Sequence, residues 1–293
     1  MTAPGRDLPP PTAPGELLAW LLVALQPMNR TRVKEVLRTG RVEVNGVSVT
    51  RHDHAVKPTD RVRILRDPPP SHDPRMAGLN IAYEDEAVIV LDKPAGLLTL
   101  ASTPGEVADT AFDRLSMAME ARRAGRVFVV HRLDQGTSGL LMFARTLELR
   151  ERIQATWETV SKTYLAVVEG VPEPPEGVIH NFLTEGVDLK VRASEFEKPG
   201  SKRAISRYRM VSTRGKCSLV EVTIDTGRKH QIRVHMAGLG CPVVGDKRYA
   251  AKFNGANRLG LHAWRLAFDH PITGKRIELE SPLPPVLRKL VGG

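Results

Sequence analysis

The chain has 293 residues, of which 41% are hydrophobic and 26% charged, and this composition is typical of a globular protein rather than a disordered one. Its two cysteines fit neither a disulfide framework nor a metal-ligand spacing, so we expect a cytoplasmic protein without a metal centre. Forty-three Lys and Arg against 33 Asp and Glu give a net charge of +10, which favours a nucleic acid partner over a small neutral metabolite, although an inert basic surface is an alternative.

The amino-terminal part of the chain is predicted to contain a small module. Residues 1–13 are rich in proline and are expected to form a disordered tail, and residues 67–78 an extended linker. The longest apolar run, residues 17–25, is too short to span a bilayer and follows no basic cluster, so neither a membrane segment nor a signal peptide is expected. The module therefore covers residues 14–66.

Within this module the pattern predicts two helices and a hairpin. The helices are expected over residues 17–28 and 30–40, and Asn45-Gly46 predicts a hairpin turn within residues 41–49. Residues 30–66 hold ten Lys or Arg against four Asp or Glu, which is more than half of the net charge. The segment resembles the S-four-type RNA-binding domain. A basic piece that merely packs on the larger domain is the alternative.

Residues 79–293 are predicted to form an α+β domain. The first half is expected to contain a hairpin (79–96), a helix (109–125), a strand–loop–strand unit (127–144) and a second helix (147–160). Three strands (162–170, 204–211 and 217–225) and a third helix (229–240) are expected to follow. Few connections are long enough for parallel crossovers. We therefore expect a largely antiparallel sheet.

A polar loop between two apolar strands contains Asp134. A carboxylate in this setting loses hydration and needs a cation, for which Arg132 and Arg233 are the candidates. A paired Asp134 stays ionised and can act as a nucleophile or a base, whereas its alternative role is that of a turn former. Motifs for a phosphate loop, a hydrolase elbow or a dinucleotide site are not found in the sequence. A reaction without a cofactor is expected.

The loop also carries a family resemblance. Residues 131–145, HRLDQGTSGLLMFAR, resemble the central motif of the RluA-type pseudouridine synthases, and four further stretches agree in order: 91–99, 161–170, 226–249 and 260–271. The resemblance implies a mixed, largely antiparallel sheet crossed by a catalytic cleft. It also implies conversion of specific uridines in structured RNA to pseudouridine, with large-subunit ribosomal RNA favoured and transfer RNA as the alternative.

The resemblance assigns three catalytic residues. Asp134 is the essential aspartate, which either adds to the anomeric carbon of the ribose or removes the neighbouring proton; both routes stay open. Tyr164 stacks on the uracil and is the expected base for the final ring proton. Arg233 pairs with the aspartate.

Five further residues are expected to bind the substrate. Arg132 fills the gap that the flipped uridine leaves in the RNA stack, and Ile232 forms an apolar wall against the base. The others are His131, Thr137 and Lys93. A non-catalytic RNA-binding or ribosome-assembly factor and a glycoside hydrolase are the alternatives, and the latter needs a second carboxylate near Asp134. The oligomeric state cannot be predicted, and a monomer is the default.

Overall fold

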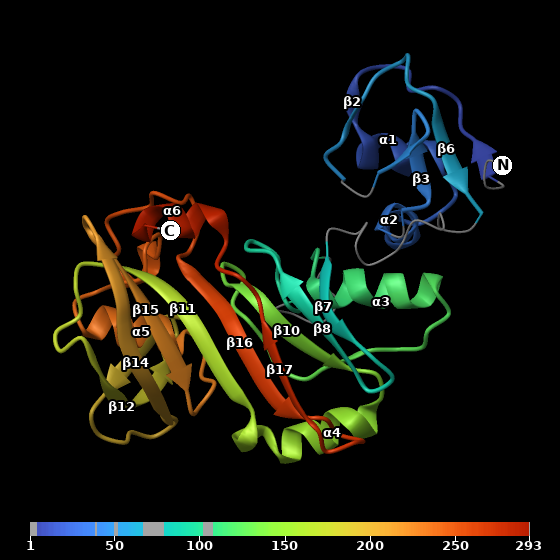
Figure 1. Cartoon of the computed structure of the whole chain (residues 1–293). Coiled ribbons are helices and arrows are strands. Elements are labelled where there is room, and N and C mark those ends of the chain that lie inside the picture. The colour runs from blue at the N-terminus through green and yellow to red at the C-terminus, as the bar shows by residue number, and fades with distance from the viewer. Residues whose placement is uncertain (1–4, 39, 50–51, 67–78, 102–107, 293) are drawn as a thin grey trace. The chain divides into compact units, whose positions relative to one another are not determined.

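The structure is a computed structural model that describes residues 5–38, 40–49, 52–66, 79–101 and 108–292. The chain divides into two compact units (Figure 1): a smaller one of residues 1–77 with 117–124, and a larger one of residues 78–116 with 125–293. The linker predicted at residues 67–78 lies outside the described residues. No helix in the described parts is both long and apolar enough to cross a membrane.

The smaller unit contains the elements that the sequence predicts. Two helices, α1 (Leu17–Ala24) and α2 (Arg30–Arg38), precede a hairpin of β3 (Val42–Val44) and β4 (Val47–Ser48). Asn45 and Gly46 both have positive φ, 54° and 83°, as a tight hairpin turn requires. The helices and the strands share one apolar core, whose fully buried members include Leu17, Leu21, Val33, Val42 and Val62.

The expectation of a disordered tail over residues 1–13 is wrong for the part that the structure describes. Strand β1 (Gly5–Asp7) pairs antiparallel with β6 (Val62–Leu65) and completes a sheet of order β1-β6-β3-β4. Leu8 packs into the core, and Asp7 forms an ion pair with Arg61 at 3.1 Å. Extended, proline-rich sequence is compatible with an edge strand, and one buried leucine with a charge pair anchors it. A second short pair joins β2 (Gly15–Glu16) to β5 (Ala55–Val56).

The larger unit is built on an 11-stranded sheet, and the predicted α+β class with largely antiparallel pairing is confirmed. The main path runs through β13 (Val191–Ser194), β12 (Glu176–Glu185), β14 (Lys202–Arg214), β15 (Cys217–Ile224), β11 (Ser161–Glu169), β16 (Leu261–Asp269), β10 (Ser138–Ala144), β8 (Val88–Lys93) and β7 (Asn80–Glu84). Strands β17 (Arg276–Glu280) and β9 (Phe128–Val129) pair with β16 and β10.

Helices cover the sheet in separate places. Figure 1 shows α4 (Leu147–Ala155) beside β10, where its Leu149 and Ile153 join a buried apolar cluster. Every residue of β10 is buried, which explains why this strand reads as a continuous apolar run rather than an alternating one. Helix α5 (Gln231–Gly238) packs on β13 and β14, as Figure 1 also shows for β14. Helix α6 (Pro285–Val291) packs on β14 and β15, whereas α3 (Ala111–Ala121) is divided between the two units at residue 117.

One junction of the sheet positions the loop that contains Asp134. Strands β10 and β16 pair in parallel, with Gly139 opposite Ala263. Gly139 has a φ of 107°, and a Cβ there would lie 2.2 Å from the carbonyl oxygen of Ala263. Ser138 is fixed beside it, because its hydroxyl contacts Nδ1 of His262 at 2.8 Å and accepts a hydrogen bond from Arg258 at 2.7 Å. At position 139 only glycine permits the backbone of β10 to approach the Ala263 carbonyl this closely.

Candidate active site

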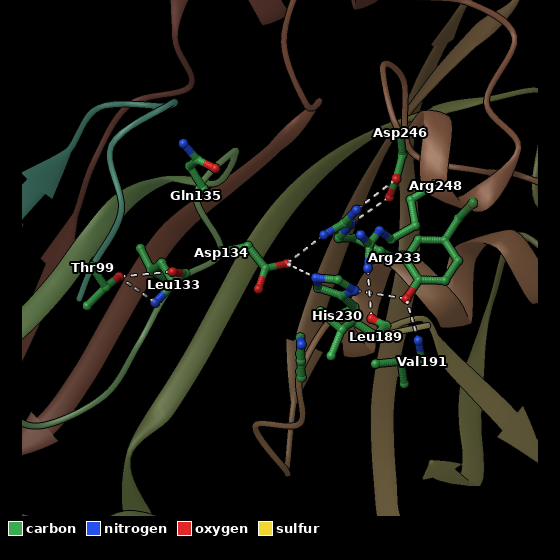
Figure 2. A network of polar contacts seen from close by, with 12 residues as sticks. Thr99, Leu133, Asp134, Gln135, Leu189, Val191, His230, Arg233, Asp246 and Arg248 are labelled. Atoms are coloured by element: carbon green, nitrogen blue, oxygen red, sulfur yellow. Dashed lines mark hydrogen bonds and ion pairs between the residues drawn. The ribbon is translucent and has the colours of Figure 1, made fainter. Parts of the chain in front are cut away.

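The backbone on each side of Asp134 is fixed by the loop that follows β8. The Thr99 hydroxyl donates to the carbonyl of Leu133 at 2.9 Å and accepts from the Leu133 amide at 3.1 Å. On the other side, the Gly96 amide donates to the carbonyl of Gln135 at 2.8 Å. Figure 2 shows Thr99 and Leu133 bonded beside Asp134, whose side chain points away from them. The carboxylate is thus presented from a rigid turn.

Lys93, which is expected to bind the substrate, holds the same loop and does not line the cavity in front of Asp134. Its side chain is fully buried, and Nζ donates to the carbonyls of Leu97 at 2.7 Å, Pro94 at 3.0 Å and Gln135 at 3.3 Å. Burial, assisted by the positive charge of Arg258, lowers the pKa of Lys93 to about 8. The ammonium therefore joins the loop after β8 to the turn that carries Asp134.

Arg233 contacts Asp134, and this confirms the expected proximity of the two side chains. Its Nη1 donates to Oδ2 of Asp134 at 3.1 Å. Its Nε and Nη2 donate to Oδ2 and Oδ1 of Asp246 at 2.6 and 2.8 Å (Figure 2). Asp246 is almost completely buried, with 1% of its side chain exposed, whereas Asp134 keeps 26%. Burial opposes the charge of Arg233, but the two carboxylates outweigh it and raise the Arg233 pKa. Asp246 therefore aims the guanidinium at the more accessible Asp134.

A buried polar network fixes α5, the helix that carries Arg233. The side-chain Nε2 of Gln231 donates to Oγ of Ser206 at 3.0 Å, and the same Oγ contacts Nδ1 of His235 at 2.8 Å. Nε2 of His235 contacts Oδ1 of Asn181 at 3.0 Å. Burial lowers the pKa of His235 to about 4, so the ring is neutral at physiological pH and can take one hydrogen bond in each direction. The helix is thus bonded to β12 and β14 through its buried side.

A cavity opens in front of Asp134 and Arg233. Of the residues expected at the site, those that line it are Arg132, Asp134, Thr137, Tyr164, Ile232 and Arg233. Arg132 is exposed, and Ile232 is buried and supplies apolar surface. The Thr137 amide closes the turn by donating to the carbonyl of Asp134 at 3.0 Å. Arg228 also lines the cavity, which thus combines a carboxylate, three arginine side chains and an apolar wall.

Tyr164 enters the cavity from β11, in the middle of the sheet. It is 8% exposed, and a register shift between β11 and β16 occurs at Thr163/Tyr164. Burial, with the negative charge of Asp134 as a second cause, raises the pKa of the phenol. Tyr164 is therefore protonated at neutral pH before substrate binds.

His131 has a different position from the one expected. Nε2 of its ring accepts a hydrogen bond from the amide of Met142 at 3.0 Å, and the ring lies 5.2 Å from that of Trp157. Burial, assisted by the charge of Lys162, lowers the pKa of His131 to about 4. His131 does not line the cavity. Because its nitrogen is occupied within the fold, we assign it a structural role instead of substrate binding.

Three residues of the site were not singled out from the sequence. Asp246, His230 and Tyr249 all lie in the stretch 226–249, which carried part of the resemblance, yet no pattern assigned them a partner. His230 lines the cavity with Nε2 3.9 Å from Oδ2 of Asp134, and Tyr249 contacts both His230 and the guanidinium of Arg233. The sequence signal that could have found two of them is that an acidic residue, Asp246, and an aromatic residue, Tyr249, follow the helix that carries Arg233.

Residues 87–238, more than half of the chain, match the family model described as RNA pseudouridylate synthase. The chain belongs to this family. A relative from Bacillus subtilis (strain 168), described as the uncharacterized RNA pseudouridine synthase YlyB, is 36% identical over 90% of this chain and 88% of its own. The ribosomal large subunit pseudouridine synthase D of Neisseria meningitidis (serogroup A / serotype 4A, strain Z2491) is 31% identical over 96% of this chain and 79% of its own.

Solved structures agree on the fold. Human RNA pseudouridylate synthase domain containing 4 matches with a TM-score of 0.59 and 24% identity, over 71% of this chain and 90% of that one. The resemblance to RluA-type enzymes is confirmed by the relatives. This pseudouridine synthase therefore isomerises uridine within RNA, and neither a non-catalytic binding factor nor a glycoside hydrolase is supported.

Proposed function

We propose that this synthase modifies uridines in large-subunit ribosomal RNA and that Asp134 is its reacting group. The substrate class is supported by relatives named ribosomal large subunit pseudouridine synthase D in Neisseria meningitidis and Xanthomonas campestris, each 31% identical over 96% of this chain. The observation that carries the role of Asp134 is its contact with Arg233, 3.1 Å away in a cavity that also holds Tyr164. With ribosomal RNA as substrate, the cytoplasm is the proposed location.

Asp134 acts on the ribose of the bound uridine. The carboxylate either bonds to the anomeric carbon as the bond to uracil N1 breaks, or removes the proton on the neighbouring carbon. In both routes the detached uracil turns within the cavity, and its C5 bonds to the anomeric carbon. In the first route the bond between the carboxylate and that carbon breaks at this step, and in the second the abstracted proton returns to the neighbouring carbon. Arg233 keeps the carboxylate oriented, because two further hydrogen bonds to Asp246 prevent the guanidinium from following the substrate.

The final step moves a proton from C5 of the ring to solvent while N1 gains one, so the reaction is balanced without a cofactor. Tyr164 is next to the carboxylate whose negative charge contributes to its raised pKa. Once C5 has bonded to the anomeric carbon the carboxylate is free again in either route, so the proton leaves C5 beside a charged Asp134 and a protonated phenol, and Tyr164 is proposed to relay it. Its ring also offers a stacking surface for the uracil.

Two further residues of the cavity suit a flipped nucleotide. Ile232 is buried and presents apolar surface to the base, while the exposed Arg132 adjoins Asp134 in sequence. A planar guanidinium can stack in the position that the extruded uridine leaves empty. The side chain of Arg132 forms no ion pair or hydrogen bond within the described parts of the chain. It is therefore available to RNA.

The smaller unit is proposed to grip the RNA backbone. Residues 30–66 carry ten basic and four acidic residues, and Arg30 and Arg32 are exposed on the first turn of α2. Phosphate contacts of this kind add affinity without reading sequence. The oligomeric state proposed is a monomer.

The test is pseudouridine mapping of total RNA from cells that carry the wild-type gene, Asp134→Asn or Asp269→Asn. We expect a site in large-subunit ribosomal RNA that disappears in Asp134→Asn and persists in the control, because Asp269 is an exposed partner of Arg276 outside the cavity. A lost site in transfer RNA alone would overturn the substrate class. Modification that persists in Asp134→Asn would overturn the role of Asp134.

A further inference from the structure

His230 has a backbone conformation that few side chains adopt. It precedes α5 with φ 55° and ψ 16°, in the left-handed region that favours glycine. Strained residues of this kind cluster at functional sites, where the surrounding structure holds them. Here the His230 carbonyl accepts from the Val234 amide at 3.0 Å, and the next amide, that of Gln231, donates to the carbonyl of Arg228 at 3.1 Å. A histidine thus occupies a position where glycine would be free of strain.

The ring of His230 is held in the cavity beside Asp134. Its side chain is 11% exposed, and Nε2 lies 3.9 Å from Oδ2 of Asp134. Figure 2 marks this contact with a dashed line. This separation is too long for a hydrogen bond. On the other edge, Nδ1 contacts the hydroxyl of Tyr249 at 2.9 Å, and the two rings meet edge to face. The nitrogen nearer to the carboxylate is thus left for another partner.

The hydrogen bonds of Tyr249 determine which nitrogen carries the proton. The Tyr249 oxygen already accepts from the Val191 amide at 3.1 Å, and burial raises the pKa of the phenol, so the hydroxyl keeps its hydrogen and donates it to Nδ1. Burial also lowers the pKa of His230. A neutral ring that accepts at Nδ1 has its hydrogen on Nε2. His230 therefore directs an N–H donor towards the space in front of Asp134.

We infer that this N–H binds the 2′-hydroxyl oxygen of the target ribose, so that His230 is a residue with which the enzyme distinguishes uridine from 2′-deoxyuridine. Both routes open to Asp134 bring its carboxylate against the anomeric carbon and C2′, and the 2′-oxygen is the substituent next to it. Arg233 is less suited to this contact, because its three guanidinium nitrogens each bond a carboxylate oxygen. The 2′-hydroxyl is the group that tells RNA from DNA.

The inference rests on the proposed role of Asp134 and is tested by binding without turnover. The RNA is a synthetic fragment centred on the uridine that mapping identifies, made with either uridine or 2′-deoxyuridine at that position. Dissociation constants are measured for Asp134→Asn and for the double variant that adds His230→Phe. We expect 2′-deoxyuridine to weaken binding about tenfold when His230 is present, which is the effect of losing one buried hydrogen bond, and to leave it unchanged in the double variant.

Two further variants complete the test. His230→Asn replaces the ring by a side chain that tolerates the left-handed region, and it should also lose the discrimination even if the phenylalanine variant folds poorly. His180→Phe changes an exposed histidine of β12 that accepts from Arg203, and it should keep the tenfold ratio. Equal affinities with His230 present, or an unchanged ratio in both His230 variants, would overturn the inference. Absence of any Asp134-dependent site in RNA would instead refute the proposed function.

Discussion

Replacing Asp246 by alanine separates orientation of Arg233 from the chemistry of Asp134. Asp246 accepts two charge-assisted hydrogen bonds, at 2.6 and 2.8 Å, and is 1% exposed, while Arg233 is 12% exposed. Removing one partner of a buried ion pair costs about 3 to 5 kcal/mol. Because Arg233 keeps its bond to Asp134, we expect the lower end, about 3 kcal/mol of the free energy of unfolding.

The folded Asp246→Ala protein should also turn over more slowly. Without Asp246 the guanidinium is held by one hydrogen bond, and a displacement of about 1 Å at a reacting group can reduce the rate about 100-fold. Urea denaturation measures the first quantity, and single-turnover rates at saturating RNA measure the second. Glu280→Gln is the control, since its pair with Arg265 is half exposed and contributes about 0 to 1 kcal/mol. An Asp246→Ala protein with wild-type rate and stability would refute the reasoning.

Three further outcomes are expected. The pKa of Lys93 is lowered from 10.5 to about 8, so Lys93 loses its proton in the native state at a lower pH than in the unfolded state. Between pH 8 and 10.5 its contribution to stability therefore rises, while turnover falls because the hydrogen bonds to the loop after β8 weaken. The pH profiles of the wild type and Lys93→Met should differ in this window, and identical profiles would exclude the idea. Gly139→Ala places a Cβ 2.2 Å from the Ala263 carbonyl and should lower the unfolding free energy by more than about 4 kcal/mol, which a thermal melt within a few degrees of wild type would contradict. A protein starting at residue 78 should bind RNA with a shallower dependence of log affinity on log salt but retain its single-turnover rate at saturation; an unchanged slope would show that the smaller unit does not contact phosphate.

The sequence predicted those elements whose residues alone determine them. The Asn45-Gly46 turn and the apolar run of β10 were read correctly, because turn geometry and complete burial each leave a local signature. Strand β12 was missed because it lies near the end of the sheet, where Val178 remains 56% exposed and its neighbours are polar. The strand β1 was missed because its pairing depends on β6, almost sixty residues later.

Some residues of the site could likewise be predicted from the sequence, and others could not. The chemistry of a carboxylate in an apolar setting pointed to a cation, and Arg233 fulfils that need. Lys93 was misassigned because its three carbonyl partners come from turns whose shape no pattern in the sequence specifies. Asp246 depends on where the chain returns after α5, and so its role is visible only in three dimensions.

The parallel contact between β10 and β16 also constrains when the enzyme can become active during synthesis. Ser138 and His262, which meet there, are 124 residues apart in the chain. Pairing over such a distance is slow compared with local hairpin formation. A nascent chain can therefore form the hairpin of β7 and β8 while the turn bearing Asp134 still lacks the neighbour that abuts Gly139. Catalytic competence then arises only after β16, which follows the turn bearing Asp134 by more than 120 residues, has left the ribosome.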